Sequence, residues 1–411
     1  MQLVDATRIV IDAIAQTMGS DFQPLIDSDT ELPISNKAFA ALDSQALIDI
    51  GKAVTGEEHI ASLNNNLVTL IGKHIIEDRT YNTRIPSIYV ESYDWGGFLE
   101  RTRIGLGEIF DDPMYTKQFG DNFAELEHTY FGQPAYSKIF DEAKAIMVPM
   151  STEREQIREA FNSMDALNSY ISKREGKIRS TINLALKVVE SMLLQNGIAI
   201  SDVKNDSAVH LITEAIAAGV IEAPEEGETL TYEDVRLDPN WLAYAMFRMK
   251  QIRSYLMDIS SAFNDGTMPT WCDEDPTLIV LDDFKDACKV YVKANTFNPD
   301  EIGVGALESV PAWQAILDVD QSSVEHKYNP MTLSSVSIAA NNAAKIGQST
   351  KYEQSGVVGL MFDKSAMGIC LRRSKVTSSY TASADFWNTY FHELYDHIID
   401  SSYSIVAFIA D

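Results

Sequence analysis

The chain has 411 residues, of which 45% are hydrophobic and 23% are charged, so it is long enough for two or more folded modules and too apolar for wholesale disorder. Its 60 acidic and 33 basic residues give a formal net charge of −27, which repels phosphate backbones and argues against sequence-specific nucleic-acid binding. The three cysteines (Cys272, Cys288 and Cys370) show no CxxC spacing, and no apolar run approaches the ~20 residues that span a bilayer. We therefore expect no disulfide framework, zinc knuckle or membrane span.

Residues 1–79 alternate amphipathic helical pieces with turn signals. The opening stretch MQLVDATRIVIDAIAQTMG has the 3.6-residue period of a helix, and LDSQALIDIGKAV from Leu42 predicts a second helix. The start lacks the basic front and the small-residue cleavage site of a signal peptide. We therefore expect the chain to be made and kept in the cytoplasm, or released from it by lysis.

Residues 80–150 are rich in Tyr, Phe, Gly and Pro, and turn dipeptides interrupt their short β-like runs. Too few consecutive residues are apolar for a core of their own, yet too many are aromatic for a disordered linker. A segment of this kind is stable when it packs against something else. It therefore predicts an extended arm that lies on a neighbour.

Helix signals return after residue 150. The stretch Thr152-Glu153-Arg154-Glu155 fits a capping box, which would start a helix at Thr152. Apolar residues in steps of three, four and seven then predict a short helix and a long one with a single apolar face. We expect the long helix to run from about Met164 to Gln195, with Gly176 able to break or bend it and Asn196-Gly197 as its stop. The apolar stripe consists of Ile157, Phe161, Met164, Leu167, Ile171, Ile178, Ile182, Leu186, Val189 and Leu193.

Residues 205–345 predict a compact α/β module, because strand and helix patterns alternate there. The stretches DSAVHLITEAIAAG and DPNWLAYAMFRMKQIRSYLMDISSAF are helical in pattern, the second with Asp238 as its N-cap and Pro239 in its first turn. The stretch PTLIVLDDFKDACKVYVKAN predicts a buried strand that leads into a helix. After Gly356 strands resume, and the continuous apolarity of YSIVAFIA predicts a central strand that is covered on both faces.

One pair of histidines, His392 and His397, suggests a zinc site of the HExxH type. That site needs histidines at i and i+4, whereas a spacing of i+5 turns the second imidazole ~140° away on a helix and places it on the opposite face of a strand. We favour a polar stretch near the surface. Dinucleotide-loop, phosphate-loop, calcium-loop and nucleophile-elbow patterns each lack a required residue, so the sequence predicts no catalytic or metal-binding residue and no cofactor.

The order of these segments resembles the major capsid protein of tailed bacteriophages with the Hong Kong 97-like fold, closest in pattern to those of small phi-29-type podophages. The resemblance is clearest in two blocks, DALNSYISKREGKIRSTINLALKVVESMLLQNG and GLMFDKSAMGICLRRSKVTSSYTASADFWNTYFHELYDHIIDSSYSIVAFIAD. In such proteins a strand that ends in Asp-Lys precedes a hairpin with an aromatic-rich tip, and a last strand returns through the peripheral domain.

The resemblance implies an α+β fold with five segments. These are an N-terminal arm and helices at 1–79, an extended E-loop at 80–150, the spine helix and peripheral (P) domain at 151–204, the axial (A) domain at 205–345, and closing strands of the P domain at 346–411. The E-loop would lie across an adjacent subunit, with Tyr89, Tyr93, Trp95 and Phe98 as anchors at the contact between subunits. Packing of these aromatics within the loop's own hairpin is the alternative.

The implied function is structural and not enzymatic. Copies of the chain would self-assemble into the hexamers and pentamers of an icosahedral or prolate virion head, built in the host cytoplasm, that encloses dsDNA without sequence-specific binding. The implied partners are the chain itself and portal, scaffolding and decoration proteins, with no membrane. Two alternatives stay open: the shell protein of an encapsulin-type nanocompartment and, more remotely, a metal-dependent hydrolase built around His392 and His397.

Overall fold

The computed structural model describes residues 84–90, 99–105, 135–140, 143–225, 227–292, 306–314, 333–340, 350–381, 383 and 385–411, together with short helical pieces between 12 and 70. The chain divides into two compact units. The first comprises Met1–Thr83, Ala143–Val189 and Leu371–Tyr395. The second comprises Arg84–Glu142, Glu190–Cys370 and Asp396–Asp411. One long helix and two long strands continue from one unit into the other.

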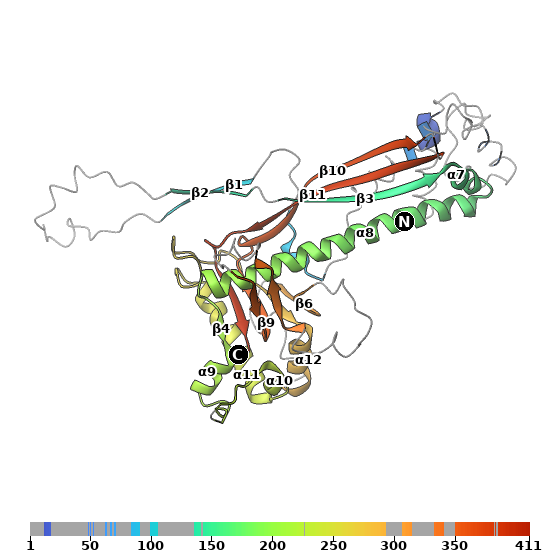
Figure 1. Ribbon diagram of the computed structural model, residues 1–411. Helices are drawn as coiled ribbons and strands as arrows, with labels where there is room; N and C mark the ends of the chain where they lie inside the picture. The colour runs from blue at the N-terminus through green and yellow to red at the C-terminus, as the bar shows by residue number, and fades with distance from the viewer. Residues whose placement is uncertain are drawn as a thin grey trace, which may run out of the picture. The chain divides into compact units, whose positions relative to one another are not determined.

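The first unit contains a three-stranded sheet in the order β10-β11-β3 (Figure 1). Its strands are β10 (Met367–Thr381), β11 (Phe386–Ile399) and β3 (Ala143–Glu153). Only residues 382–385 separate β10 from β11, so these neighbours form an antiparallel hairpin, because a parallel pair needs a crossover of a dozen or more residues. Buried and half-buried residues alternate in β11 from Phe386 to Tyr395, which is the period of a strand with one face in a core.

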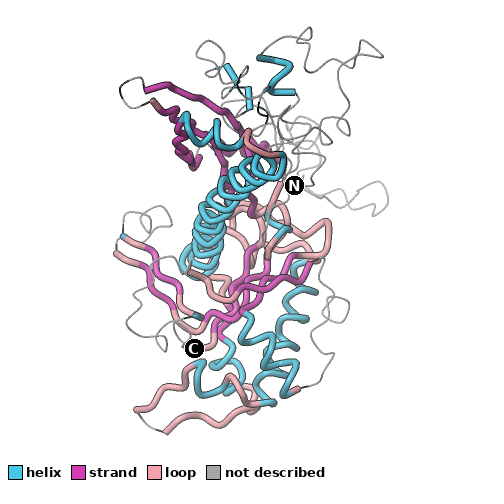
Figure 2. Tube along the Cα trace, turned by 90° about the vertical axis from the view of Figure 1, so that its right-hand side faces the viewer, coloured by secondary structure: helices cyan, strands magenta, loops and turns pink. Residues whose placement is uncertain are grey.

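The short and the long helix that the apolar stripe predicts are both present, as α7 (Arg154–Ala160) and α8 (Met164–Ala199). The first part of α8 runs beside the three-stranded sheet (Figures 1 and 2). It continues through Gly176 without a break. Every residue of the stripe whose side chain the structure describes is buried. The stripe is therefore the core face of both helices.

Two predicted helix boundaries are wrong. The capping box at Thr152 does not form, because β3 keeps the backbone extended up to Glu153, and Glu153 then precedes α7 without a side-chain cap. The helix also does not stop at Asn196-Gly197, since α8 continues to Ala199 and into a π-helical turn, η3 (Ile200–Lys204). A Cβ atom at position 197 would lie 2.7 Å from Sδ of Met367. Close packing against Met367, and not the end of a helix, therefore explains why position 197 is a glycine.

The stretch Asp165–Lys204 is long and apolar enough to cross a membrane by length and composition, which the sequence reading did not anticipate. However, 56% of its most apolar window is buried inside the protein. A core helix of a folded domain has this composition as well, and the buried stripe supports that reading of α8.

The second unit is built on a five-stranded mixed sheet in the order β4-β12-β9-β5-β6. Its strands are β4 (Val209–His210), β12 (Ile405–Ile409), β9 (Val357–Phe362), β5 (Thr277–Leu281) and β6 (Ala306–Val310). β12 pairs in parallel with β4 and antiparallel with β9, whereas β5 pairs antiparallel with β9 and in parallel with β6. All residues of β5, β9 and β12 are buried, which confirms that YSIVAFIA holds a central strand.

Side-chain alternation in β9 shows what covers each face of this sheet. A Cβ atom at Gly359 would lie 3.2 Å from Cε of Met249, so this row faces α11 (Pro239–Leu256). The neighbouring residue Leu360 points the other way, and its Cδ2 lies 3.4 Å from a Cβ atom placed at Gly197 in α8. Helices therefore cover both faces, as the continuous apolarity of the central strands predicts.

The second unit also contains the helices α9 (Leu211–Ala217), α10 (Tyr232–Val235) and α12 (Asp282–Tyr291). α12 follows β5 directly, and the Asp238 side chain accepts a hydrogen bond of 2.9 Å from the backbone N–H of Asn240 at the start of α11, so both predictions are confirmed. The stretch DSAVHLITEAIAAG is only partly helical. Its Val209 and His210 form β4, because they pair with Phe408 and Ile409 of β12. The second unit also holds a small antiparallel pair, β7 (Val336–Ile338) and β8 (Tyr352–Gln354).

Candidate assembly arm and its anchor points

Two strands of the predicted arm form a ribbon within the second unit (Figure 1). β1 (Leu99–Ile104) pairs antiparallel with β2 (Ala135–Phe140), and the register places Arg101 opposite Lys138 and Arg103 opposite Tyr136. Directly opposite residues of an antiparallel pair share a face. One face of the ribbon is therefore cationic and aromatic. The other face carries Glu100, Thr102, Ile104, Ala135, Ser137 and Ile139.

The cationic face docks on the turn between β11 and β12, residues 400–404. The Arg103 guanidinium donates to the backbone carbonyl of Ser402 at 2.8 Å and lies over the Tyr403 ring, 4.2 Å from its centroid. Arg101 donates to the backbone carbonyl of Ser365 and also lies over Tyr403, at 5.8 Å. Cation–π contacts and hydrogen bonds, and not an apolar core, therefore hold the ribbon to the turn.

Lys138 makes the one ion pair in this contact between described residues. Its Nζ lies 3.1 Å from Oδ1 of Asp400, whose side chain is only 2% exposed. The same oxygen accepts hydrogen bonds from the backbone N–H and the hydroxyl of Ser402, at 3.2 and 2.8 Å. A buried carboxylate is costly without such partners, so the position of Lys138 supports the conformation of the turn as well as the docking of the ribbon.

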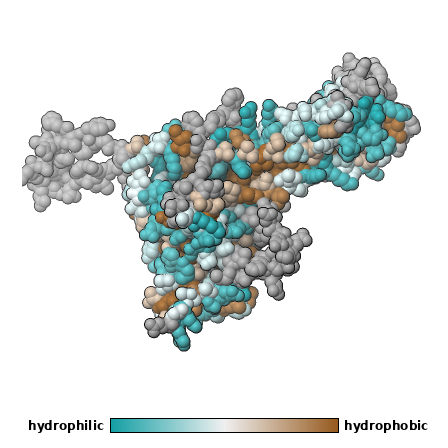
Figure 3. Space-filling view, in the orientation of Figure 1, coloured by the Kyte–Doolittle hydropathy of each residue, from teal (hydrophilic) through white to brown (hydrophobic). Residues whose placement is uncertain are grey.

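The outer face of the ribbon exposes apolar side chains. Ile104 is 66% exposed and Ile139 is 57% exposed. Hydrophobic residues gather in several patches between hydrophilic areas on the face of the molecule shown in Figure 3. The register places Thr102 and Ser137 between the two isoleucines. An isolated two-stranded ribbon is marginal in water, so the ribbon depends on contacts beyond its own strand pair.

A second anchor lies at the root of the arm, in the strap formed by residues 84–90. The strap contains the short 3₁₀ turn η2 (Pro86–Ile88) and is held by contacts to four different elements. Ser87 donates from its backbone N–H and its hydroxyl to Glu308 of β6, at 2.9 and 2.6 Å. The Tyr89 hydroxyl donates to Glu190 of α8 at 2.6 Å. The other two contacts are Arg84 with Asp282 of α12, at 2.5 Å, and the Val90 N–H with the carbonyl of Ile369 in β10, at 2.9 Å.

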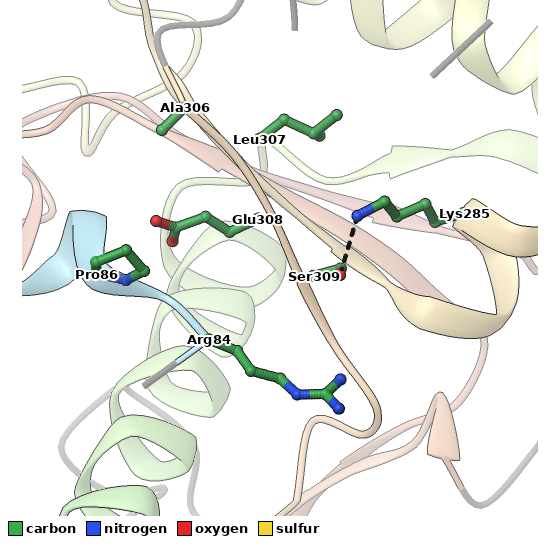
Figure 4. A pocket seen from close by; sticks show the side chains of 7 residues that line it. All are labelled: Arg84, Pro86, Lys285, Ala306, Leu307, Glu308 and Ser309. Carbon is green, nitrogen blue, oxygen red and sulfur yellow. Dashed lines mark hydrogen bonds between the residues drawn. The ribbon is translucent and has the colours of Figure 1, made fainter. Parts of the chain in front are cut away.

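Two carboxylates, Glu308 and Glu190, accept the hydrogen bonds that the strap donates, and Figure 4 shows the side chain of Glu308 next to Pro86 of the strap. Burial raises the pKa of the Glu308 carboxyl, and the charge of Glu190 raises it further, while the two hydrogen bonds from Ser87 lower it. Donors of the strap thus lie between two carboxylates that repel each other. The strap fixes where the arm leaves the folded sheet.

The structure describes one of the four predicted aromatic anchors. Tyr89 is half-buried and bonded to Glu190 within its own chain, whereas Tyr93, Trp95 and Phe98 lie outside the described residues. Whether any of the four contacts another subunit stays a prediction. The ribbon cations were missed, although the alternation in LERTRI places Arg101 and Arg103 on one face of a strand and could have indicated them.

The two histidines of the discarded zinc motif both lie on β11. Nε2 of His392 is 2.9 Å from the Thr377 hydroxyl, and both histidines are half-buried. Within the described ranges, no group of three or more His, Cys, Asp or Glu side chains is arranged to hold a metal ion. All three cysteines are buried, and burial raises the pKa of the Cys288 thiol to about 12.

Comparison with known families shows that this is a structural protein of a phage capsid. The chain belongs to the family of Phi29-like phage major capsid proteins, whose model matches residues 11–409. The family defines a structural role in the virion, with many copies of the chain assembled in a shell, and it does not favour an encapsulin or a hydrolase. A search of curated protein sequences found no significant match.

Several solved phage structures resemble the chain. A structure of the head fibre and inner core protein of native bacteriophage P68 gives a TM-score of 0.48 at 12% identity, covering 81% of this chain and 86% of that one. The capsid of Staphylococcus phage Andhra gives 0.47 at 13% identity with the same coverage, 81% and 86%. The capsid of cyanophage P-SCSP1u gives 0.39 at 11% identity, covering 79% and 86%.

Proposed function

We propose that the chain forms the hexamers and pentamers of an icosahedral or prolate head that encloses phage dsDNA. In this proposal the subunit has the Hong Kong 97-like subdivisions expected from the sequence: N-terminal arm 1–79, E-loop 80–150, spine helix and P domain 151–204, A domain 205–345, and closing P-domain strands 346–411. Strands β9 and β12 of the last segment also complete the five-stranded sheet that contains β5 and β6. Membership of the capsid-protein family supports assembly into a shell, and the β1–β2 ribbon supports an extended arm at 80–150.

The observation that carries the proposal is the two-faced ribbon. Its cationic face is satisfied within the chain, by the turn 400–404, while its opposite face leaves Ile104 and Ile139 exposed. In the proposed shell an adjacent subunit covers these two side chains, since a shell of identical subunits supplies a neighbour beside every arm. The arm then lies across an adjacent subunit, and Tyr89, Tyr93, Trp95 and Phe98 belong to the contact region.

The remaining partners follow from the same proposal. Portal and scaffolding proteins would set the start and the size of the head, decoration proteins would bind its outside, and assembly would take place in the host cytoplasm. The net charge of −27 supports a shell that encloses DNA without gripping its phosphates.

Electron microscopy of the purified chain, expressed alone and together with its neighbouring genes, tests the proposal directly. The double variant Ile104→Glu, Ile139→Glu should fold but fail to form closed shells, because two charges would be buried at the contact of the arm. Val290→Glu is the matched control, since Val290 is 76% exposed but lies on α12, outside the arm. Closed shells from the double variant would contradict the proposed contact between the arm and an adjacent subunit. If the unchanged chain forms no shell under any condition, the proposed shell itself is wrong.

A further inference from the structure

The turn that receives the ribbon, residues 400–404, makes a second set of contacts through Ser401. This residue is 1% exposed, and its hydroxyl accepts a hydrogen bond of 2.6 Å from Nζ of Lys204 and donates one of 2.9 Å to Oδ2 of Asp265. Its backbone carbonyl accepts from the N–H of Asp265 at 2.9 Å. Nζ of Lys204 and Oδ2 of Asp265 are 4.0 Å apart, so Ser401 bridges the two members of an ion pair.

These partners belong to two other elements of the second unit. Lys204 ends the π-helical turn η3, in which α8 leaves regular helical geometry, and Asp265 lies in the loop between α11 and β5. η3 also contacts β12, because the Ser201 hydroxyl accepts from the N–H of Ala407 at 2.8 Å. Single π-helical turns are rare and occur frequently at functional sites. The turn 400–404 therefore connects the ribbon to the end of α8.

The contacts of Ser401 and those of the ribbon depend on one backbone conformation. Asp400 and Ser402, which flank Ser401, accept the hydrogen bonds of Lys138 and Arg103. Oδ1 of Asp400 also accepts from the backbone N–H of Ser402 at 3.2 Å, so this hydrogen bond spans Ser401. A change of the backbone at Ser401 would break it, and loss of Lys138 would remove the ionic partner of a buried carboxylate.

Both sets of contacts are easier to break than the apolar core of the sheet. The side chains of Lys138 and Lys204 are 43% and 45% exposed, so water competes for both ammonium groups. A two-stranded ribbon is also marginal by itself. The ribbon of a free subunit should therefore open and close while the five-stranded sheet stays folded.

We propose that the turn 400–404 is a conformational switch that couples docking of the ribbon to the structure of η3. A docked ribbon fixes the backbone on both sides of Ser401, which lets this residue bind Lys204 and Asp265. Release of the ribbon leaves the Asp400 carboxylate without its cation, so the turn rearranges and η3 loses these contacts. In the proposed shell, a neighbouring subunit that covers the arm shifts the equilibrium toward the docked state and so stabilises the end of α8. The coupling itself is a property of the free subunit and does not need the shell.

Hydrogen exchange in the unassembled full-length chain tests the switch. Arg101→Met together with Arg103→Met should speed proteolysis of the ribbon and also raise the exchange rates of two distant amides about fivefold or more. These are the amides of Ser207 and Asp265, whose hydrogen bonds go to the carbonyls of Ser201 and Ser401 and not to the ribbon. Unchanged exchange beside faster proteolysis would overturn the switch, because the two regions would then be independent. Unchanged proteolysis would overturn it as well, because contacts other than those to the turn would then hold the ribbon.

Two exposed lysines on other helices of the same unit provide the control. Lys250 lies on α11 and Lys289 on α12, so their replacement removes the same number of positive charges away from the turn. Lys250→Met together with Lys289→Met should leave both proteolysis and exchange unchanged. Equal acceleration in this control would also overturn the switch, since exchange would then follow net charge and not docking.

Coupling is reciprocal, so a change at Ser401 or its partners should release the ribbon. Ser401→Ala and, separately, Asp265→Asn should speed proteolysis of the ribbon about fivefold or more, with denaturant unfolding to show that the sheet remains folded. Asp283→Asn is the matched control, since it breaks the ion pair with Arg236, 3.2 Å long, outside the turn. Proteolysis at the rate of the unchanged chain in both variants would show that the switch is wrong, and the proposed shell would stand. Failure of the unchanged chain to form shells would contradict only the proposed function.

Discussion

The five-stranded sheet and the β1–β2 ribbon belong to the same unit, yet opposite interactions stabilise them. Every residue of β5, β9 and β12 is buried, and helices cover the sheet on both faces. The ribbon has one face held by Arg101, Arg103 and Lys138 and another that exposes isoleucines. Loss of apolar burial should therefore unfold the sheet, whereas loss of charge should release the ribbon from a chain that remains folded.

Deletion of Ser404–Asp411 should have the largest effect. The deletion removes β12, whose Ile405, Val406, Phe408 and Ile409 are fully buried at roughly 1.5–3 kcal/mol each, against a total stability of ~5–15 kcal/mol. It also leaves β4 and β9 without their shared partner, which creates aggregation-prone edges. The truncated chain should be insoluble and yield no particles in expression tests.

Deletion of Asp411 alone is the control for this truncation. Its side chain contacts His210 and Gln354, and its backbone carbonyl accepts from the N–H of Thr213 at 3.2 Å, but the side chain is 40% exposed. The cost should be about 1 kcal/mol or less, with particles still formed. A soluble chain without residues 404–411 that still builds closed shells would show that β12 is dispensable.

Two glycines should respond to alanine in opposite directions. Gly356 precedes β9 with φ of +75°, and a Cβ atom there would collide with the backbone carbonyl of Ala410, so Gly356→Ala should destabilise the sheet by ~2 kcal/mol or more. Gly176 lies inside α8 with no neighbour within 4 Å of a Cβ atom, so Gly176→Ala should stabilise the chain by about 0.5–1 kcal/mol. Denaturant midpoints measure both. A stabilising Gly356→Ala would contradict the described turn.

The ribbon should respond to charge and salt with little change in overall stability. Arg101→Met together with Arg103→Met removes the contacts to Ser365, Ser402 and Tyr403 but keeps the partner of the buried Asp400, so proteases should cut near β1 and β2 faster while the unfolding midpoint moves little. Added salt should have the same effect on the unchanged chain, because these contacts are electrostatic and partly exposed. Lys187→Met on the exposed side of α8 serves as the control. Unchanged proteolysis in the double variant would mean that other contacts hold the ribbon.

The smallest expected effect is a pH dependence at the root of the arm. Burial and the charge of Glu190 raise the pKa of Glu308 above its unfolded value, so its contribution to stability is fully present below the unfolded pKa and is lost as pH rises through the folded one. Glu308→Gln should therefore gain stability relative to the unchanged chain between pH 4 and pH 7. Asp234 has the opposite sign, because hydrogen bonds from Thr231 lower its pKa. Its contribution to stability is present above the unfolded pKa and is lost as pH falls through the folded one, so Asp234→Asn should be less stable than the unchanged chain at neutral pH, with the difference disappearing in acid. Parallel pH profiles of Glu308→Gln and the unchanged chain would contradict the shift.

The sequence predicts best where local pattern and tertiary contact agree. The strand and helix at 277–291, the Asp238 cap and the central β12 follow from apolar runs and capping chemistry alone. Predictions failed where a distant partner overrides a local signal. Pairing in the sheet keeps Thr152 extended despite its capping box, and Met367 requires the small residue at Gly197 that resembles a helix stop.

The candidate site shows the same limit more strongly. The partners of the ribbon cations lie in residues 365 and 400–403, more than 200 positions away along the chain. The local sequence LERTRI therefore cannot predict which residues these cations contact. Likewise, the strap at 84–90 is held by residues at 190, 282, 308 and 369. Each segment looks unremarkable by itself, because the site exists only after the chain has folded.

The position of β12 in the sheet also determines how late during synthesis the five-stranded sheet can be completed. Val209 of β4 pairs with Phe408, about 200 residues later in the chain. At ~5–20 residues per second, a ribosome delivers β12 on the order of 10–40 seconds after β4. Until then the five-stranded sheet is open in its middle, and the turn that receives the ribbon has not been made. Nascent chains on one polysome therefore lack the docked arm, which should keep neighbouring unfinished subunits from joining before they are released.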